Sequence, residues 1–132
     1  MADRGAGGFA RVALAAIRIV NGSTALVAPS VLTSKVGVGP SDNQAARYVF
    51  RMFGVRTVVI GIELLLPDGE VRRAAVRVAP VIHAADTAAA AIAGLTRQIP
   101  PRPALVATII SATNTLLALS AAAGLRASEP SG

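Results

Sequence analysis

Six polar side chains lie inside stretches of the sequence that are otherwise apolar. They are Arg18, Arg56, Glu63, His83, Asp86 and Asn114. A charge at the centre of a bilayer costs a few kcal/mol or more, so residues of this kind are usually functional or pair with one another. A His three residues before an Asp shares a helix face with it, where the two can hydrogen-bond or pass a proton. This set could therefore support proton transfer, ion pairing or the capture of a charged headgroup.

The depth of these residues along antiparallel helices predicts how they pair. Arg18 and Glu63 fall toward the same end, which predicts an ion pair between them. Arg56 is level with Asp86, which predicts a second pair, with His83 and Asn114 hydrogen-bonding around it. Such pairs could form a site, or they could neutralise each other and fix the register of the helices.

The candidates divide by the chemistry that they could carry. Acid and base candidates are His83, Asp86 and Glu63, although no Ser or Cys nucleophile motif accompanies them. Candidates for binding a ligand are Arg18, Arg51, Arg56 and Asn114. Arg47 and Arg51 are four residues apart, so they could share a face and meet anionic lipid headgroups, or simply extend to the interface. No metal site is expected: His83, Asp86 and Glu63 could offer nitrogen and oxygen ligands, but the charge of nearby Arg56 would compete with a metal ion for them. The sequence leaves any cofactor unknown.

The composition places the chain among membrane proteins. Of 132 residues, 53% are hydrophobic and only 15% are charged, against about 45–50% and 25% in soluble domains. The net charge of +6 comes from basic residues scattered between apolar runs rather than gathered in one stretch, which argues against a nucleic-acid partner. The expected partner is the lipid bilayer. With no Cys, the chain has neither disulfides nor thiolate metal ligands.

The apolar runs predict four membrane-spanning helices in a single domain, residues 1–132. The expected spans cover residues 12–32, 50–66, 78–97 and 104–125, with flexible ends at residues 1–8 and 127–132. The last span has no charge and exceeds the roughly 20 residues that a bilayer requires. Ser41 to Gln44 fits a capping box and predicts a helix start. Pro67-Asp68-Gly69 predicts a turn, with the next helix beginning near Glu70 and carrying small residues that allow close helix packing.

The expected fold class is therefore all-α, a four-transmembrane-helix antiparallel bundle in the cell membrane. Both termini share one side, which carries six Lys or Arg residues against five on the other, and this favours cytoplasmic termini. A cleaved signal peptide is the alternative for the first span. Arg18 would interrupt its apolar region and no A-x-A site follows, so we expect the span to be retained.

Three segments together resemble one family. They are Ala28-Pro29, Arg51-Met52-Phe53-Gly54-Val55-Arg56 and His83-Ala84-Ala85-Asp86. From about Val12 to Leu125 the chain resembles an uncharacterised family of small bacterial four-helix membrane proteins, catalogued as a domain of unknown function. The resemblance implies a bacterial membrane location, four helices and a shared reason for keeping Arg51, Arg56, His83 and Asp86.

The expected role is a ligand-binding or lipid-binding membrane protein, or an accessory interaction protein, with a charged cluster inside the membrane. It could act as a homo-oligomer or in a larger membrane complex. One alternative is a small membrane enzyme that acts on a lipid-soluble substrate through His83 and Asp86, with Arg56 steering an anionic group. Another is a component of proton-coupled transport.

Overall fold

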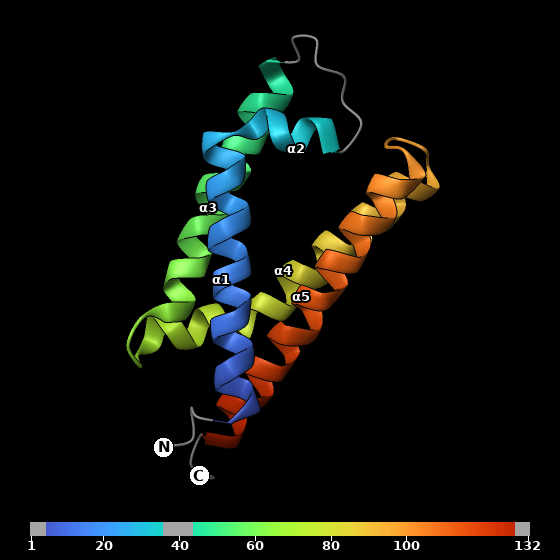
Figure 1. The fold of residues 1–132 in the computed structure, drawn as a ribbon. Helices are drawn as coiled ribbons and strands as arrows, with labels where there is room; N and C mark the ends of the chain where they lie inside the picture. The colour runs from blue at the N-terminus through green and yellow to red at the C-terminus, as the bar shows by residue number, and fades with distance from the viewer. Residues whose placement is uncertain (1–4, 36–43, 129–132) are drawn as a thin grey trace.

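The computed structural model describes residues 5–35 and 44–128, and the ordered elements in these ranges are all helices (Figure 1). They are α1 (Ala6–Val27), α2 (Pro29–Lys35), α3 (Gln44–Leu65), α4 (Glu70–Leu95) and α5 (Pro101–Ser128). The predicted all-α class is confirmed. The capping box at residues 41–43 and the outermost ends, 1–4 and 129–132, lie outside the described residues.

The first predicted span is divided in two. α1 begins at Ala6, so Gly8, which was assigned to a flexible end, is a buried helical residue. α1 ends at Val27 rather than at residue 32, because the residue before a proline is disfavoured in the helical conformation. Ala28 adopts φ −130° and ψ 61°, and its N–H donates to the Thr24 carbonyl at 2.9 Å. Pro29 then starts α2, where its missing N–H costs nothing.

The four long helices form two antiparallel hairpins, one of α1 with α3 and one of α4 with α5 (Figure 1). The hairpins join mainly through α1 and α5, and they diverge toward the end of the molecule that carries α2. α3 and α4 are consecutive in the chain, but they meet over a short stretch only. The arrangement is thus a pair of splayed hairpins rather than an even four-helix bundle.

Glycines set how closely the helices approach. A Cβ added to Gly54 of α3 would lie 2.6 Å from the carbonyl oxygen of Gly22 in α1. At the other end of α1, a Cβ on Gly7 would lie 2.8 Å from the Gly124 Cα in α5. Backbones in contact at small residues are typical of helix packing in membranes, where lipid supplies little drive for large side chains to associate.

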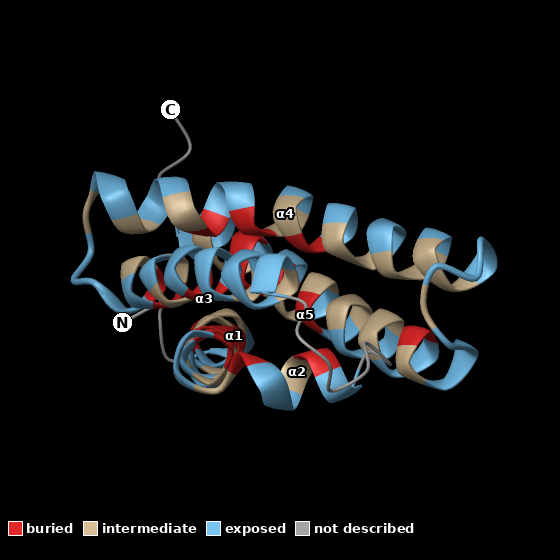
Figure 2. Ribbon diagram, turned by 90° about the horizontal axis from the view of Figure 1, so that it is seen from above, coloured by how far each residue is buried: buried red, intermediate tan, exposed pale blue. Residues whose placement is uncertain are grey.

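The interior is small, and large apolar side chains cover the outside. The core cluster draws on α1, α3, α4 and α5 and consists of Leu14, Ala15, Leu64, Val76, Ala79, Ala118, Ala121 and Ala122. Many Val, Leu and Ile side chains are exposed instead, and Figure 2 shows that buried residues follow the inward sides of the helices while exposed residues cover the outer sides. An apolar exterior of this extent suits lipid rather than water.

Three helices are long and apolar enough to cross a membrane: α1, α4 and α5. Four spans were predicted, and the one that corresponds to α3 is not among these three. Its 22 residues include Arg47, Arg51, Arg56 and Glu63, and these charges lower its hydropathy. The structure is therefore compatible with a multi-pass membrane protein that has three clear candidate spans.

Candidate functional site

A buried arginine joins the two hairpins. Arg18 lies on the inward face of α1 with 4% of its surface exposed, and His83 lies on α4 with 2% exposed. The Arg18 Nη1 is 2.6 Å from His83 Nε2 and 3.3 Å from Nδ1. The two residues are 65 positions apart in the sequence, so this contact ties one hairpin to the other.

The contact with Arg18 favours a neutral imidazole. A guanidinium has donors only, so the ring nitrogen that it approaches must be an unprotonated acceptor. His83 Nδ1 faces Asp86 Oδ2 at 3.9 Å, too far for a direct hydrogen bond. The Arg18 cation, the neutral ring of His83 and the Asp86 carboxylate therefore follow one another. The side chain of Asp86 is 38% exposed.

Three buried polar atoms of α1, α3 and α5 lack a protein partner. The Arg18 Nε, the Thr57 Oγ1 of α3 and the Asn114 Oδ1 of α5 are buried and have no hydrogen-bond partner in the part of the chain described. Thr57 precedes by one turn the Gly61 that packs against the Arg18 Cβ. Buried polar atoms of this kind are commonly satisfied by water.

Threonines link α4 to α5 beside the cluster. The Thr87 hydroxyl donates to the His83 carbonyl at 2.7 Å, and its oxygen lies 3.1 Å from the Thr115 Oγ1 of α5. The Thr115 hydroxyl also lies 2.9 Å from the Ser111 carbonyl. These contacts join α4 to α5 one turn beyond His83.

The structure brings together Arg18, His83 and Asp86, but not in the predicted pairs. No ion pair joins Arg18 to Glu63 within residues 5–35 and 44–128, because Gly61 rather than Glu63 faces Arg18. Likewise no ion pair is found between Arg56 and Asp86 in these ranges. Arg56 is on the exposed side of α3, away from the face that carries Thr57 and Gly61. Asn114 is buried on α5, and its Oδ1 does not bond to His83.

A groove opens between α3 and α4 where the hairpins begin to diverge. It has a volume of about 460 Å³, within the range of small-molecule sites. Its lining is apolar apart from two carboxylates and consists of Ile60, Glu63, Glu70, Val71, Ala74, Ala75, Val78 and Ile82. Glu63 was a candidate from the sequence, whereas Glu70 was not, because a Glu in the first turn of a helix usually just complements the helix dipole.

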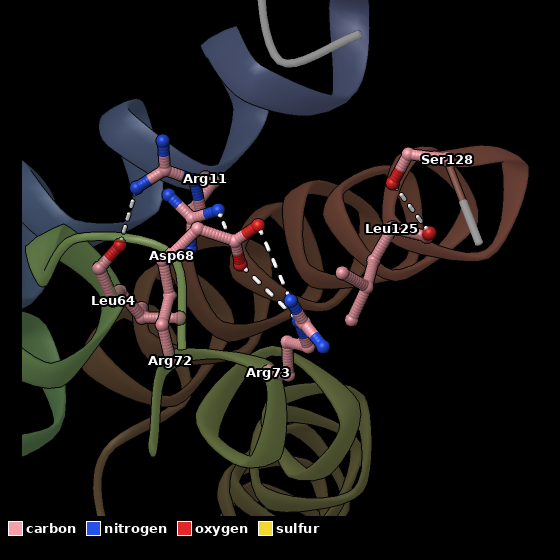
Figure 3. Close-up of polar contacts among 7 residues, drawn as sticks. All are labelled: Arg11, Leu64, Asp68, Arg72, Arg73, Leu125 and Ser128. Atoms are coloured by element: carbon pink, nitrogen blue, oxygen red, sulfur yellow. Dashed lines mark hydrogen bonds and ion pairs between the residues drawn. The ribbon is translucent and has the colours of Figure 1, made fainter. Parts of the chain in front are cut away.

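A second polar group lies near the ends of α3 and α5 (Figure 3). Arg11 donates to the Leu64 carbonyl, which satisfies an acceptor that the end of α3 leaves open. Asp68, in the turn before α4, accepts from Arg73 at 3.2 Å and pairs with Arg72 at 2.9 Å. The hydrogen bond from Arg73, with the charges of Arg73 and Arg72, holds the pKa of the Asp68 carboxyl below its usual value. The spacing of Asp68 to Arg72, i to i+4, was the signal that could have revealed this group.

Arg51 lies apart from both the cluster and the groove. It is exposed near the start of α3 and lines a shallow depression of about 260 Å³ with Gln44, Arg47 and Tyr48. In the described residues, no group of three or more His, Asp and Glu side chains is arranged to hold a metal ion.

No family model, no curated protein and no solved structure matches this chain. The resemblance to the bacterial four-helix family therefore stays a prediction.

Proposed function

We propose that this chain is a four-span protein of the cell membrane that binds an amphiphilic ligand drawn from the bilayer. The observation that carries the proposal is the groove between α3 and α4, where an apolar wall meets two carboxylates. In this proposal, the Arg18–His83 pair holds the two hairpins in the arrangement that leaves the groove open.

The fold argues for α3 as the fourth crossing. α1 and α3 each have 22 residues, a length of about 33 Å that matches the hydrocarbon thickness of a bilayer. α3 packs antiparallel along α1 (Figure 1), so if α1 crosses the membrane, α3 must return the chain across it. The start of α1 and the end of α5 meet at Gly7 and Gly124, which requires an even number of crossings.

Cysteine labelling can test the number of crossings and the orientation. The natural chain has no Cys, so single variants Lys35→Cys, Gly69→Cys, Arg97→Cys and Ser128→Cys each give one label site. Four crossings predict that a membrane-impermeant maleimide reaches Lys35→Cys and Arg97→Cys from one side, and Gly69→Cys and Ser128→Cys from the other. Cytoplasmic termini place the second group inside the cell. Labelling of Lys35→Cys and Gly69→Cys from the same side would overturn the fourth crossing.

The groove has the features of a site for an amphiphile. Half of its lining residues are exposed at the surface, so lipid-soluble molecules can enter it sideways from the bilayer. Its apolar walls can bury a hydrocarbon chain at about 0.8 kcal/mol for each buried CH₂ relative to water. Because lipid competes for the same walls, the polar groups must provide the selectivity, and in this groove those groups are Glu63 and Glu70.

Mass spectrometry of the protein purified in a mild detergent tests this binding. We expect the wild-type chain to retain a bound lipid or other amphiphile, and the Ala74→Phe variant, which fills the groove, to lose it. Ala84→Phe is the matched control, since Ala84 is also an exposed alanine of α4 but does not line the groove. Equal retention by all three proteins, or absence of a bound amphiphile in the wild type, would count against the proposal.

The enzyme alternative receives less support from the geometry. A catalytic His83 would need contact with a substrate, but its side chain is almost fully buried and its Nε2 is engaged by Arg18. These features favour a role in joining helices, with Asp86 as a nearby counter-charge. Association with further copies or with a larger membrane complex, and membership of the bacterial family, are part of the proposal.

A further inference from the structure

We infer that the groove between α3 and α4 selects a positively charged amphiphile, a protonated amine or quaternary ammonium on an apolar chain. This inference rests on the proposed function, because it names the class of ligand for the same groove. Two independent features of the lining lead to it: the sign of its charges and their position along the groove.

The charged groups that line the groove are both acidic. Glu63 comes from the end of α3 and Glu70 from the start of α4, and the described lining holds no basic side chain. No hydrogen bond or ion pair of either carboxylate is found within residues 5–35 and 44–128. The neighbouring basic residues Arg72 and Arg73 are bonded to Asp68 in the turn. The groove therefore presents negative charge that a cationic group can neutralise.

The polarity of the groove changes along its length. Glu63 and Glu70 flank the turn between α3 and α4, while Val78 and Ile82 lie farther along α4. The twelve residues from Glu70 to Ile82 cover about 18 Å of helix. One end of the groove is thus charged and close to the membrane surface, and the rest is apolar and extends into the membrane. An amphiphile lying along the bilayer normal matches this arrangement, with its headgroup at the membrane surface and its apolar chain inside the membrane.

The apolar wall strengthens the preference for a cation. A charge pair interacts more strongly where the surroundings have a low dielectric constant than in water. A carboxylate-bearing amphiphile would meet like charges at the only polar end of the groove, which is unfavourable. A zwitterionic lipid would place a phosphate next to the same carboxylates.

Two probes that differ in headgroup charge test the inference. Nitroxide-labelled stearyl trimethylammonium and nitroxide-labelled stearate have the same chain, and electron paramagnetic resonance of the protein in neutral detergent micelles reports the immobilised fraction of each. We expect the cationic probe to bind about tenfold more tightly than the anionic one, as one half-buried and one exposed carboxylate can provide. In the Glu63→Gln, Glu70→Gln double variant the ratio should fall close to one.

A charge change outside the groove provides the control. Ser128→Lys adds a positive charge at an exposed position at the same end of the molecule (Figure 3) without changing the lining or the Asp68 ion pairs, so the tenfold preference should persist. The melting temperature of each variant, followed by circular dichroism, shows that the fold is retained.

The outcomes separate this inference from the proposed function. Equal binding of both probes to the wild type, with loss of both in Ala74→Phe, would overturn the preference for a cation and leave the groove as a lipid site. Binding of the cationic probe that Ala74→Phe does not reduce would overturn the groove itself as the site. Loss of the preference in Ser128→Lys to the same extent as in the double variant would show a general surface charge effect and would also refute the inference.

Discussion

Removing the acceptor of the Arg18 hydrogen bond should destabilise the protein more than removing Arg18. His83→Leu deletes the ring nitrogen that lies 2.6 Å from Arg18 Nη1 and keeps an apolar side chain of comparable size. Arg18 remains charged, because a guanidinium is not deprotonated in proteins, and it is 4% exposed. A hydrogen bond to a charged group contributes about 1.5–3 kcal/mol. With the cost of a buried charge left without its partner, the free energy of unfolding should fall by about 3–5 kcal/mol.

The complementary variants should cost less. Arg18→Met removes the charge and leaves a neutral ring without its donor, for which about 1–3 kcal/mol is expected. The double variant, Arg18→Met with His83→Leu, replaces both groups by apolar side chains and should lie closer to the wild type than His83→Leu does, because such replacements are often nearly neutral. Adding Arg18→Met to His83→Leu should therefore restore part of the free energy of unfolding that His83→Leu alone loses.

Unfolding in detergent micelles, followed by circular dichroism as a denaturing detergent is added, provides the free energies. Ala84→Leu serves as a control, since it introduces the same side chain at an exposed position of α4 and should change stability little. A double variant that is as unstable as His83→Leu, or a His83→Leu protein as stable as the wild type, would refute a buried Arg18–His83 bond between the hairpins.

Two further predictions concern helix packing and the turn before α4. Gly54→Ala should reduce the free energy of unfolding by about 1–3 kcal/mol, because its Cβ would lie 2.6 Å from the Gly22 carbonyl oxygen. The control, Gly69→Ala, meets no atom closer than 3.8 Å and should be neutral. Equal melting temperatures for the two variants would contradict the close contact. Because Arg73 lowers the pKa of the Asp68 carboxyl, the contribution of this contact should be present above the pKa of the unfolded chain and lost as the pH falls through the lowered value. The ¹³C resonance of the Asp68 carboxyl should follow this titration, and Arg73→Gln should move its midpoint to higher pH, a shift whose absence would rule out the contact in solution.

The sequence predicted the helices well because hydropathy and turn residues act locally. The turn at Pro67-Asp68-Gly69 and the helix start near Glu70 are confirmed, and the break at Ala28 follows from the proline that comes after it. The first span was nonetheless drawn too far, to residue 32, because its apolar character continues into α2. Hydropathy alone does not detect a helix end within an apolar run.

The pairing of the buried charges was not predictable from depth alone. Arg18 and Glu63 were matched by their distance from one end of the helices, but Glu63 is two residues beyond Gly61, about 200° around α3 from the face that meets α1. Thr57 is four residues before Gly61 and shares its inward face. Arg56 lies about 140° around the helix from that face and is exposed. The Arg18–His83 bond depends in addition on how two separate hairpins pack, and that packing results from contacts far apart in the sequence.

The contact between Gly7 and Gly124 also bears on the order of the elements in the chain. The start of α1 and the end of α5 are adjacent, and each hairpin has its own internal connection. A link from α5 to α1 could therefore replace the turn from α3 to α4 as the connection between the hairpins. A circular permutant that begins at Glu70, passes from α5 to α1 through a short linker and ends at Leu65 would have the same crossings and the same helix contacts. In the proposed topology, the permutant would insert the α4–α5 hairpin before the α1–α3 hairpin, the reverse of the natural order. Both proteins should nevertheless reach the same folded structure.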